Sequence, residues 1–225
     1  IDLEFGDSLM DDERQEALWA DLLEMKSIGY LIRAKIEQNL SLVISNISSS
    51  FMGNRQLANH NTDDVKYNLN KICSVKFDKT EVLPKHIQLK FLKHRQKLNK
   101  QLISNSAAML DAVESLQEVH KKIMKTNEEI IKFNSEIINL STQLLADENL
   151  DSNYNLDPKA ISIELDSLEK QCVKSKRDCE KLTKKVDVVF RQNLEYQQTI
   201  LNKRQNIMEN RKNISETRKH INLFL

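Results

Sequence analysis

Residues that make turns and compact cores are scarce in this chain. Its 225 residues include three glycines and two prolines, and aromatic residues make up only 5% of the composition. A β-rich domain needs many tight turns, and a compact globular core of this size needs more large apolar side chains. Charged residues make up 30% of the composition. The sequence therefore predicts long helices, each buried along one stripe only.

The groups needed for catalysis or metal binding are also sparse. The three cysteines form no C-x-x-C pair, and no two of the five histidines are four residues apart, which is the spacing of a helical metal site. Three glycines are too few for a phosphate-binding loop. Cys172 and Cys179 are seven residues apart, and we interpret them as small buried hydrophobic residues. We therefore expect no catalytic residue, no metal ligand, no cofactor and no small-molecule substrate, and hence no enzyme.

Long apolar runs are missing as well. No stretch approaches the 18 or so consecutive apolar residues that a membrane-spanning helix requires. We expect no membrane insertion.

The chain does contain two long apolar repeats with alternating steps of three and four residues. The first extends from Phe91 to Leu144 and is apolar at 13 of 16 positions; the second extends from Ile161 to Phe224 and is apolar at 14 of 19. A sustained repeat of this period is typical of a left-handed coiled coil whose a and d side chains meet a partner helix. The apolar residues that we expect to form this partner-binding seam are Leu98, Leu102, Met109, Leu116, Val119, Ile123, Ile130, Phe133, Ile137, Leu140, Leu144, Leu165, Leu168, Leu182, Val186, Val189, Ile200, Ile207, Ile214 and Ile221.

The apolar face of each repeat is wider than a two-stranded seam needs, because position b is apolar too. These b residues are Ile103, Leu110, Met124, Ile131, Ile138 and Leu145 in the first repeat, and Val173, Leu194, Leu201 and Met208 in the second. Burying a, b and d together requires more than one neighbouring helix. We expect a bundle of three or more helices that other helical subunits complete, most simply as a hetero-oligomer. The alternative is a self-contained dimer of hairpins.

The predicted fold class is all-α, with long coiled-coil helices and a short N-terminal helical head. Five segments follow from the pattern: an acidic helical head over 1–48, a polar linker with a short helix over 49–83, a first long helix over 84–146, a break or hairpin loop over 147–157, and a second long helix over 158–225. The short break favours an antiparallel hairpin of the two long helices within a multi-helix bundle. A bend in one continuous rod is the alternative. Asn105 and Asn193 occupy seam positions, where a single buried Asn fixes the register.

Charge is distributed unevenly along the chain. Residues 1–64 carry a net charge of −7, whereas the whole chain carries +1. Possible basic contacts for DNA phosphate, tubulin or an acidic protein segment are Lys90, Lys93, Lys97, Lys100, Arg204, Arg211 and Arg218. An ordinary solvated coiled-coil surface is the alternative interpretation of these residues.

The stretch from Met109 to Glu129, MLDAVESLQEVHKKIMKTNEE, resembles the coiled-coil segment of the centromere protein H family, whose members are subunits of the inner kinetochore. An acidic helical head followed by a polar linker and long helices is also similar to small kinetochore subunits. The resemblance implies pairing with another helical kinetochore subunit, a nuclear location at the centromere or spindle, and a role in chromosome segregation during mitosis, within the cell cycle and cell division.

The leading hypothesis is a non-enzymatic scaffold subunit of a hetero-oligomeric coiled-coil complex, at the kinetochore, centromere or spindle. One alternative is a cytoplasmic tether or fusion helix of membrane traffic. A fusion helix would need a central Gln or Arg layer, and the second repeat has none. Another alternative is a protein that binds microtubules or DNA directly through its basic residues, and salt-sensitive binding would distinguish it.

Overall fold

A computed structural model describes residues 2–77, 83–146 and 158–224 of the chain. It contains helix α1 (Asp2–Ser48), a π-helical turn η1 (Ser49–Arg55), and helices α2 (Gln56–Phe77), α3 (Lys85–Ala146) and α4 (Pro158–Phe224). Within these ranges there is no strand, and the predicted all-α fold of long helices is confirmed. The break expected over 147–157 lies outside the described residues.

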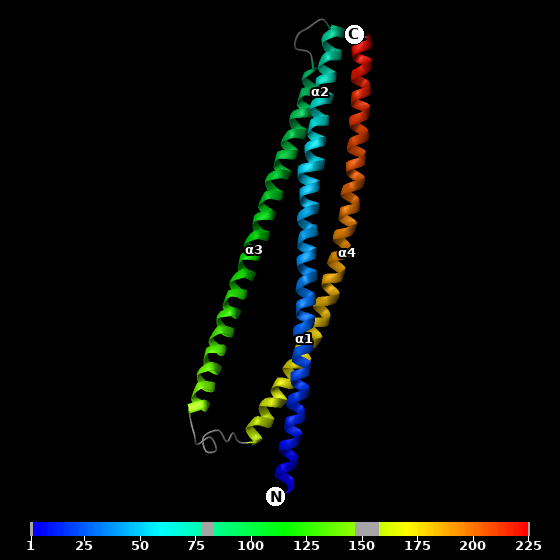
Figure 1. Ribbon diagram of the computed structural model, residues 1–225. Coiled ribbons are helices and arrows are strands. Elements are labelled where there is room, and N and C mark those ends of the chain that lie inside the picture. Colours follow the sequence, from blue (N-terminus) through cyan, green and yellow to red (C-terminus); the bar gives the residue numbers. More distant parts are fainter. Residues whose placement is uncertain (1, 78–82, 147–157, 225) are drawn as a thin grey trace. The chain divides into compact units, whose positions relative to one another are not determined.

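The chain divides into two units, of which the first joins α1, η1 and α2 with α4. In Figure 1, α1, η1 and α2 form one continuous rod, and α4 lies beside it. Contacts link Asn39 with Val186 and Asn68 with Ile214. Because residue numbers rise together along both rods, the two helices are parallel. The sequence suggested the 84–146 helix as the neighbour of α4, whereas the contacts within this unit come from the N-terminal rod.

The segment expected to be a polar linker is helical. Residues 49–77 continue the N-terminal rod as η1 and α2, whereas the sequence predicted a polar linker with only a short helix over 49–83; residues 78–82 lie outside the described residues. The Ser- and Asn-rich composition suggested a linker because polar segments rarely bury enough surface to fold. In this rod the polar side chains supply the contact themselves: Asn54 and Asn61 are both buried and hydrogen-bonded to α4.

The second unit contains α3, a helix of 62 residues. Its first turn forms directly after Pro84, whose carbonyl accepts a hydrogen bond of 2.8 Å from the backbone N–H of Ile87. Proline is well tolerated at this point because the first helical N–H groups have no intrahelical acceptor. Ion pairs along the helix surface, such as that between Lys121 and Glu118 at 2.7 Å, are of the kind that stabilise an isolated helix by a few tenths of a kcal/mol.

Candidate partner-binding surfaces and the asparagine ladder

The N-terminal half of the interface between α1 and α4 is apolar. Leu18, Leu165 and Cys172 form a buried cluster, and Met25 and Ile161 pack against it. Ile32, seven residues after Met25, is also buried. Leu18, Met25 and Ile32 thus occupy the same position in successive heptads, and their burial provides the hydrophobic stabilisation of this half.

From Asn39 onward the same position is occupied by asparagine, and we call the five asparagines the asparagine ladder. Each side-chain Nδ2 donates a hydrogen bond to a backbone carbonyl of α4. The donor–acceptor pairs are Asn39 to Val186 (3.2 Å), Asn46 to Asn193 (2.8 Å), Asn54 to Ile200 (2.9 Å), Asn61 to Ile207 (2.9 Å) and Asn68 to Ile214 (3.2 Å). All five side chains are buried. The ladder therefore replaces apolar packing with directed contacts between the helices.

The π-helical turn keeps the ladder aligned with α4. The acceptors on α4 follow one another at intervals of seven residues, but on the N-terminal rod Asn54 follows Asn46 by eight residues. In a regular α-helix one extra residue would rotate every later side chain by about 100°. Turn η1 (Ser49–Arg55) contains this extra residue, and a π turn accommodates such an insertion within an otherwise α-helical rod.

Four side-chain oxygens of the ladder fall into two groups. Asn39 Oδ1 accepts a hydrogen bond of 3.1 Å from Asn193 Nδ2, and Asn68 Oδ1 accepts one of 3.1 Å from Arg218 Nε. The Oδ1 atoms of Asn54 and Asn61 are buried and have no hydrogen-bond partner within the described structure. A buried acceptor without a partner costs about 1–3 kcal/mol. The centre of the ladder therefore carries two unsatisfied acceptors.

Arg218 binds both the ladder and an acidic residue beside it. Besides Asn68, its guanidinium donates through Nη2 to Asp64 Oδ1 at 2.7 Å, and its Cζ lies 5.1 Å from the centre of the Tyr67 ring. Tyr67 thus provides a cation–π contact beside the ion pair. At this end of the interface the guanidinium of Arg218 therefore contacts an amide oxygen, a carboxylate and an aromatic ring of the N-terminal rod.

Ion pairs flank the apolar half of the interface as well. Arg14 binds Asp166 and Glu169, and Lys176 binds Glu24 at 2.8 Å and Asp21 at 3.5 Å. Both cations donate hydrogen bonds to carboxylates, which raises their pKa values, chiefly through Glu169 for Arg14 and Glu24 for Lys176. Because these groups are solvated, their contribution to stability is small, and they mainly select the alignment of the helices.

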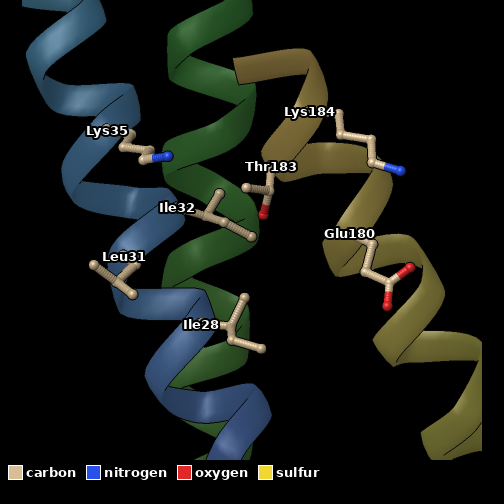
Figure 2. Close-up of a pocket in the computed structure, with 7 residues that line it drawn as sticks. All are labelled: Ile28, Leu31, Ile32, Lys35, Glu180, Thr183 and Lys184. Carbon is tan, nitrogen blue, oxygen red and sulfur yellow. The ribbon is translucent and has the colours of Figure 1, made fainter. Parts of the chain in front are cut away.

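A hollow of about 350 Å³ opens between the two helices beside the apolar half. Ile28, Leu31 and Ile32 line it from α1, and Thr183 lines it from α4 (Figure 2). Lys35, Glu180 and Lys184 complete the lining. The Nζ of Lys35 forms an ion pair of 2.8 Å with Asp187. The hollow therefore has an apolar base and charged edges.

The seam residues predicted on α4 separate into two rows. The row in contact with the N-terminal rod comprises the buried Leu165, Val186 and Ile221 and the half-buried Ile200, Ile207 and Ile214. The row of d positions (Leu168, Leu182 and Val189) is exposed. The apolar b residues Val173, Leu194, Leu201 and Met208 are exposed too. Helix α4 therefore contacts the N-terminal rod with its a positions and with its e positions, which directly follow d. The apolar side chains at b and d remain exposed on either side of this contact.

Most of the predicted seam residues of α3 are exposed. Leu98 and Leu102 are half-buried, and the side chain of Leu144 lies outside the described residues. The exposed ones are Met109, Leu116, Val119, Ile123, Ile130, Phe133, Ile137 and Leu140. Asn105, expected to fix the register, is exposed on this helix, whereas Asn193 of α4 is buried and donates a hydrogen bond to Asn39 of the ladder. Helix α3 presents an apolar stripe along most of its length.

The predicted basic contacts are placed as follows. Lys90, Lys93, Lys97 and Lys100 are exposed on α3, Arg204 and Arg211 are exposed on α4, and Arg218 is half-buried against the ladder. The asparagine ladder was not among the sites predicted from the sequence. Asparagines 39, 46, 54, 61 and 68, at intervals of seven and once eight residues, were the available signal.

Within the described ranges no three His, Cys, Asp or Glu side chains are grouped so that they could hold a metal ion. No helix among these residues has an apolar stretch long enough to cross a bilayer. Comparisons of the chain with protein-family models, with curated proteins and with solved structures gave no match.

Proposed function

We propose that this protein is a non-enzymatic scaffold subunit of a hetero-oligomeric helical complex, with the kinetochore or centromere of dividing cells as its setting. The observation that carries the proposal is the exposed apolar stripe of α3. Ile130 and Phe133 in the middle of that helix are 51% and 60% exposed, and Ile137 one turn later is 43% exposed. Soluble proteins rarely leave a contiguous apolar surface of this length uncovered, and such surfaces mark sites of protein–protein contact.

The flanks of α4 support the same proposal. Leu168 and Leu182 remain exposed although the opposite side of the helix is packed against the N-terminal rod. Helices with two apolar sides belong to bundles with several neighbours. The kinetochore setting rests on the resemblance of Met109–Glu129 to the centromere protein H family.

The test compares two variants of α3. Ile130→Asp combined with Ile137→Asp places charges on the apolar stripe, whereas Ser135→Asp combined with Thr142→Asp places the same charges, also seven residues apart, on the polar face. We expect the tagged wild-type chain and the polar-face variant to be isolated from dividing cells as one discrete complex with defined stoichiometry, and to locate at centromeres. The stripe variant should lose both properties while retaining its helix content by circular dichroism.

Two results would contradict the proposal. Sedimentation equilibrium of the purified chain could show a soluble, helical and discrete homo-oligomer, in which case other subunits are unnecessary. The stripe variant could instead retain the wild-type complex and location, which would mean that the apolar stripe of α3 is not the partner-binding surface.

A further inference from the structure

Arg204, Arg211 and Arg218 follow one another at intervals of seven residues on α4, and we call them the arginine row. Arg218 follows Asn68 by 150 residues and binds its Oδ1. Arg204 and Arg211 have the same relation to Asn54 and Asn61, whose Oδ1 atoms are the two buried acceptors without a partner. The three arginines are thus in equivalent places beside the ladder, and only Arg218 is engaged with it.

The three arginines differ in whether the N-terminal rod offers them an acidic partner. Asp64, which binds Arg218, precedes it by 154 residues, and the residues at the same distance before Arg204 and Arg211 are Ser50 and Leu57. Neither side chain carries a charge. Among the described residues, Arg204 and Arg211 form no ion pair, in contrast to Arg14, Lys35 and Lys176 in the apolar half. The central part of the rods therefore lacks the two carboxylates that would complete the pattern.

The composition of this part of the molecule makes the imbalance larger. Residues 49–62 and 197–212 together contain the basic Arg55, Lys203, Arg204, Arg211 and Lys212, and Glu209 is their only acidic residue. Apolar side chains lie between the arginines on the same face of α4. Leu201 and Met208 are 54% and 49% exposed and are three and four residues away from Arg204.

We propose that Arg204 and Arg211, with Leu201 and Met208, bind an acidic amphipathic helix of a partner subunit that carries carboxylates seven residues apart. Seven residues span about 10.5 Å along a helix, so the spacing of the partner's carboxylates matches that of the arginines. Each carboxylate takes the place that Asp64 occupies beside Arg218. Each arginine then also donates to the unpaired Oδ1 of Asn54 or Asn61, so that binding satisfies both buried acceptors.

The first of the two arginines already lies near the ladder. The nearest atom to the space where Gly53 would carry a Cβ is Nη1 of Arg204, at 3.4 Å. The guanidinium of Arg204 therefore already lies against η1, close to the ladder. A partner of mixed apolar and acidic character fits this stripe better than nucleic acid does, because phosphate offers nothing for Leu201 and Met208 to pack against.

This inference rests on the proposed scaffold function and specifies the chemistry of one partner. The probe is a synthetic amphipathic helical peptide of about four heptads with Glu at every seventh position and Leu on the adjacent row. A matched peptide carries Gln in place of Glu. Binding to the full chain is measured by fluorescence anisotropy. We expect the Glu peptide to bind at least about tenfold more tightly than the Gln peptide.

The chain supplies its own controls. Arg204→Gln with Arg211→Gln should weaken binding of the Glu peptide by about tenfold or more, whereas Lys212→Gln with Lys219→Gln, an equal loss of charge on the solvated face, should change it by less than about twofold. Leu57→Asp places a carboxylate in α2 that precedes Arg211 by the same number of residues as Asp64 precedes Arg218. It should weaken peptide binding relative to Leu57→Asn, which makes the same loss of packing without a charge.

Several outcomes would overturn the inference: no binding of the Glu peptide, equal binding of both peptides, or equal losses in the arginine and lysine variants. Binding of duplex DNA that depends on Arg204 and Arg211, without binding of the Glu peptide, would reassign the row to phosphate. Self-association that is lost only in the arginine variant would reassign it to a second copy of the chain. The Ile130 and Ile137 variant of α3 should bind the peptide normally, so failure of the scaffold proposal is distinguishable from failure of this one.

Discussion

The two halves of the interface between α1 and α4 use one heptad position in opposite ways. In the first half it carries Leu18, Met25 and Ile32, and in the second it carries the asparagine ladder from Asn39 to Asn68. Apolar side chains contribute stability in proportion to the area they bury, but they accept many alignments. Asparagines contribute less, but each amide needs an acceptor at a defined place. The comparison indicates that the apolar side chains of the first half supply stability, whereas the asparagines of the second half supply the orientation of the helices about their axes.

The ladder alone does not set the absolute register. Sliding α4 by seven residues would bring another backbone carbonyl to each Asn, so the carbonyl contacts would survive. The side-chain pair of Asn39 and Asn193 would be separated, as would the ion pairs of Arg14 and Lys176. A single Asn pair combined with flanking charges is a known way to fix the register of a coiled coil. The ladder therefore sets how α4 is oriented and rotated against the N-terminal rod. The side-chain pairs set which heptad of α4 lies beside which heptad of the rod.

The largest expected effect is in the apolar half. Leu165→Ala removes a side chain that is 6% exposed and should lower the free energy of unfolding by about 2–4 kcal/mol, through lost burial and the cavity left behind. Leu168→Ala, at a side chain that is 45% exposed, should cost less than about 1 kcal/mol in the isolated chain. Urea unfolding followed by circular dichroism measures both. Similar losses would mean that α4 does not use its a and e positions as described.

The ladder is tested by changing the length of η1 at the exposed Ser50. Insertion of Ala after Ser50 should turn Asn54, Asn61 and Asn68 away from α4 and cost about 3 kcal/mol, or about 1 kcal/mol for each lost hydrogen bond. Deletion of Ser50 restores intervals of seven residues throughout and should leave stability unchanged or higher, with η1 converted to regular α-helix. Hydrogen exchange of the backbone amides of residues 49–77 distinguishes the two. An insertion without effect would contradict the ladder.

Two asparagines of the ladder should respond to the same substitution with opposite signs. Asn39→Leu leaves the buried Nδ2 of Asn193 without its acceptor and should cost about 1–3 kcal/mol. Asn61→Leu also loses a hydrogen bond, from Nδ2 to the Ile207 carbonyl, which costs about 1 kcal/mol, but it removes a buried oxygen that has no partner, which relieves about 1–3 kcal/mol. The net effect should be neutral or slightly stabilising. Urea denaturation midpoints give the comparison. Equal losses at both positions would show that the oxygen of Asn61 is satisfied after all.

The smallest expected effect concerns Lys176 and pH. Its acidic partners raise the pKa of Lys176 above the 10.5 of an unpaired lysine, chiefly through the hydrogen bond with Glu24. A raised pKa in the folded chain means that the contribution to stability is complete below pH 10.5 and is lost as the pH rises through the folded-state pKa. The stability difference between wild type and Lys176→Gln should therefore be constant up to about pH 10 and shrink above it. A difference that stays constant into stronger alkali would contradict the pairing.

The apolar repeats made the two long helices visible in the sequence, because period alone identifies a coiled-coil helix. They did not reveal which helix meets which: the apolar positions a, b and d of α4 are compatible with several neighbours, and the contacts at a and e appear only once α1 is in place. The full extent of the helix over 49–77 was not predicted because its interface is polar. A search for apolar periodicity cannot detect an interface whose recurring residue is Asn.

The exposed candidate surfaces were partly foreseen. Arg204, Arg211 and Arg218 were recognised as a basic row, but the sequence did not show that Arg218 is engaged by Asn68 and Asp64 while its two neighbours are not. That distinction depends on the offset between the two rods. The offset is a tertiary property, because it is set by Asn39, Asn193 and the extra residue in η1.

The distance along the chain between the ladder and its acceptors has a consequence for synthesis. Asn54 and Ile200 are separated by 146 residues, so the N-terminal rod leaves the ribosome long before α4 exists. At about 5–20 residues per second, the delay is roughly 7–30 s. During that time Leu18 and Ile32 have no α4 to pack against, and long loops must close before any contact of the ladder forms. The newborn chain is therefore expected to depend on chaperones, or on partner subunits already present, until its last helix is made.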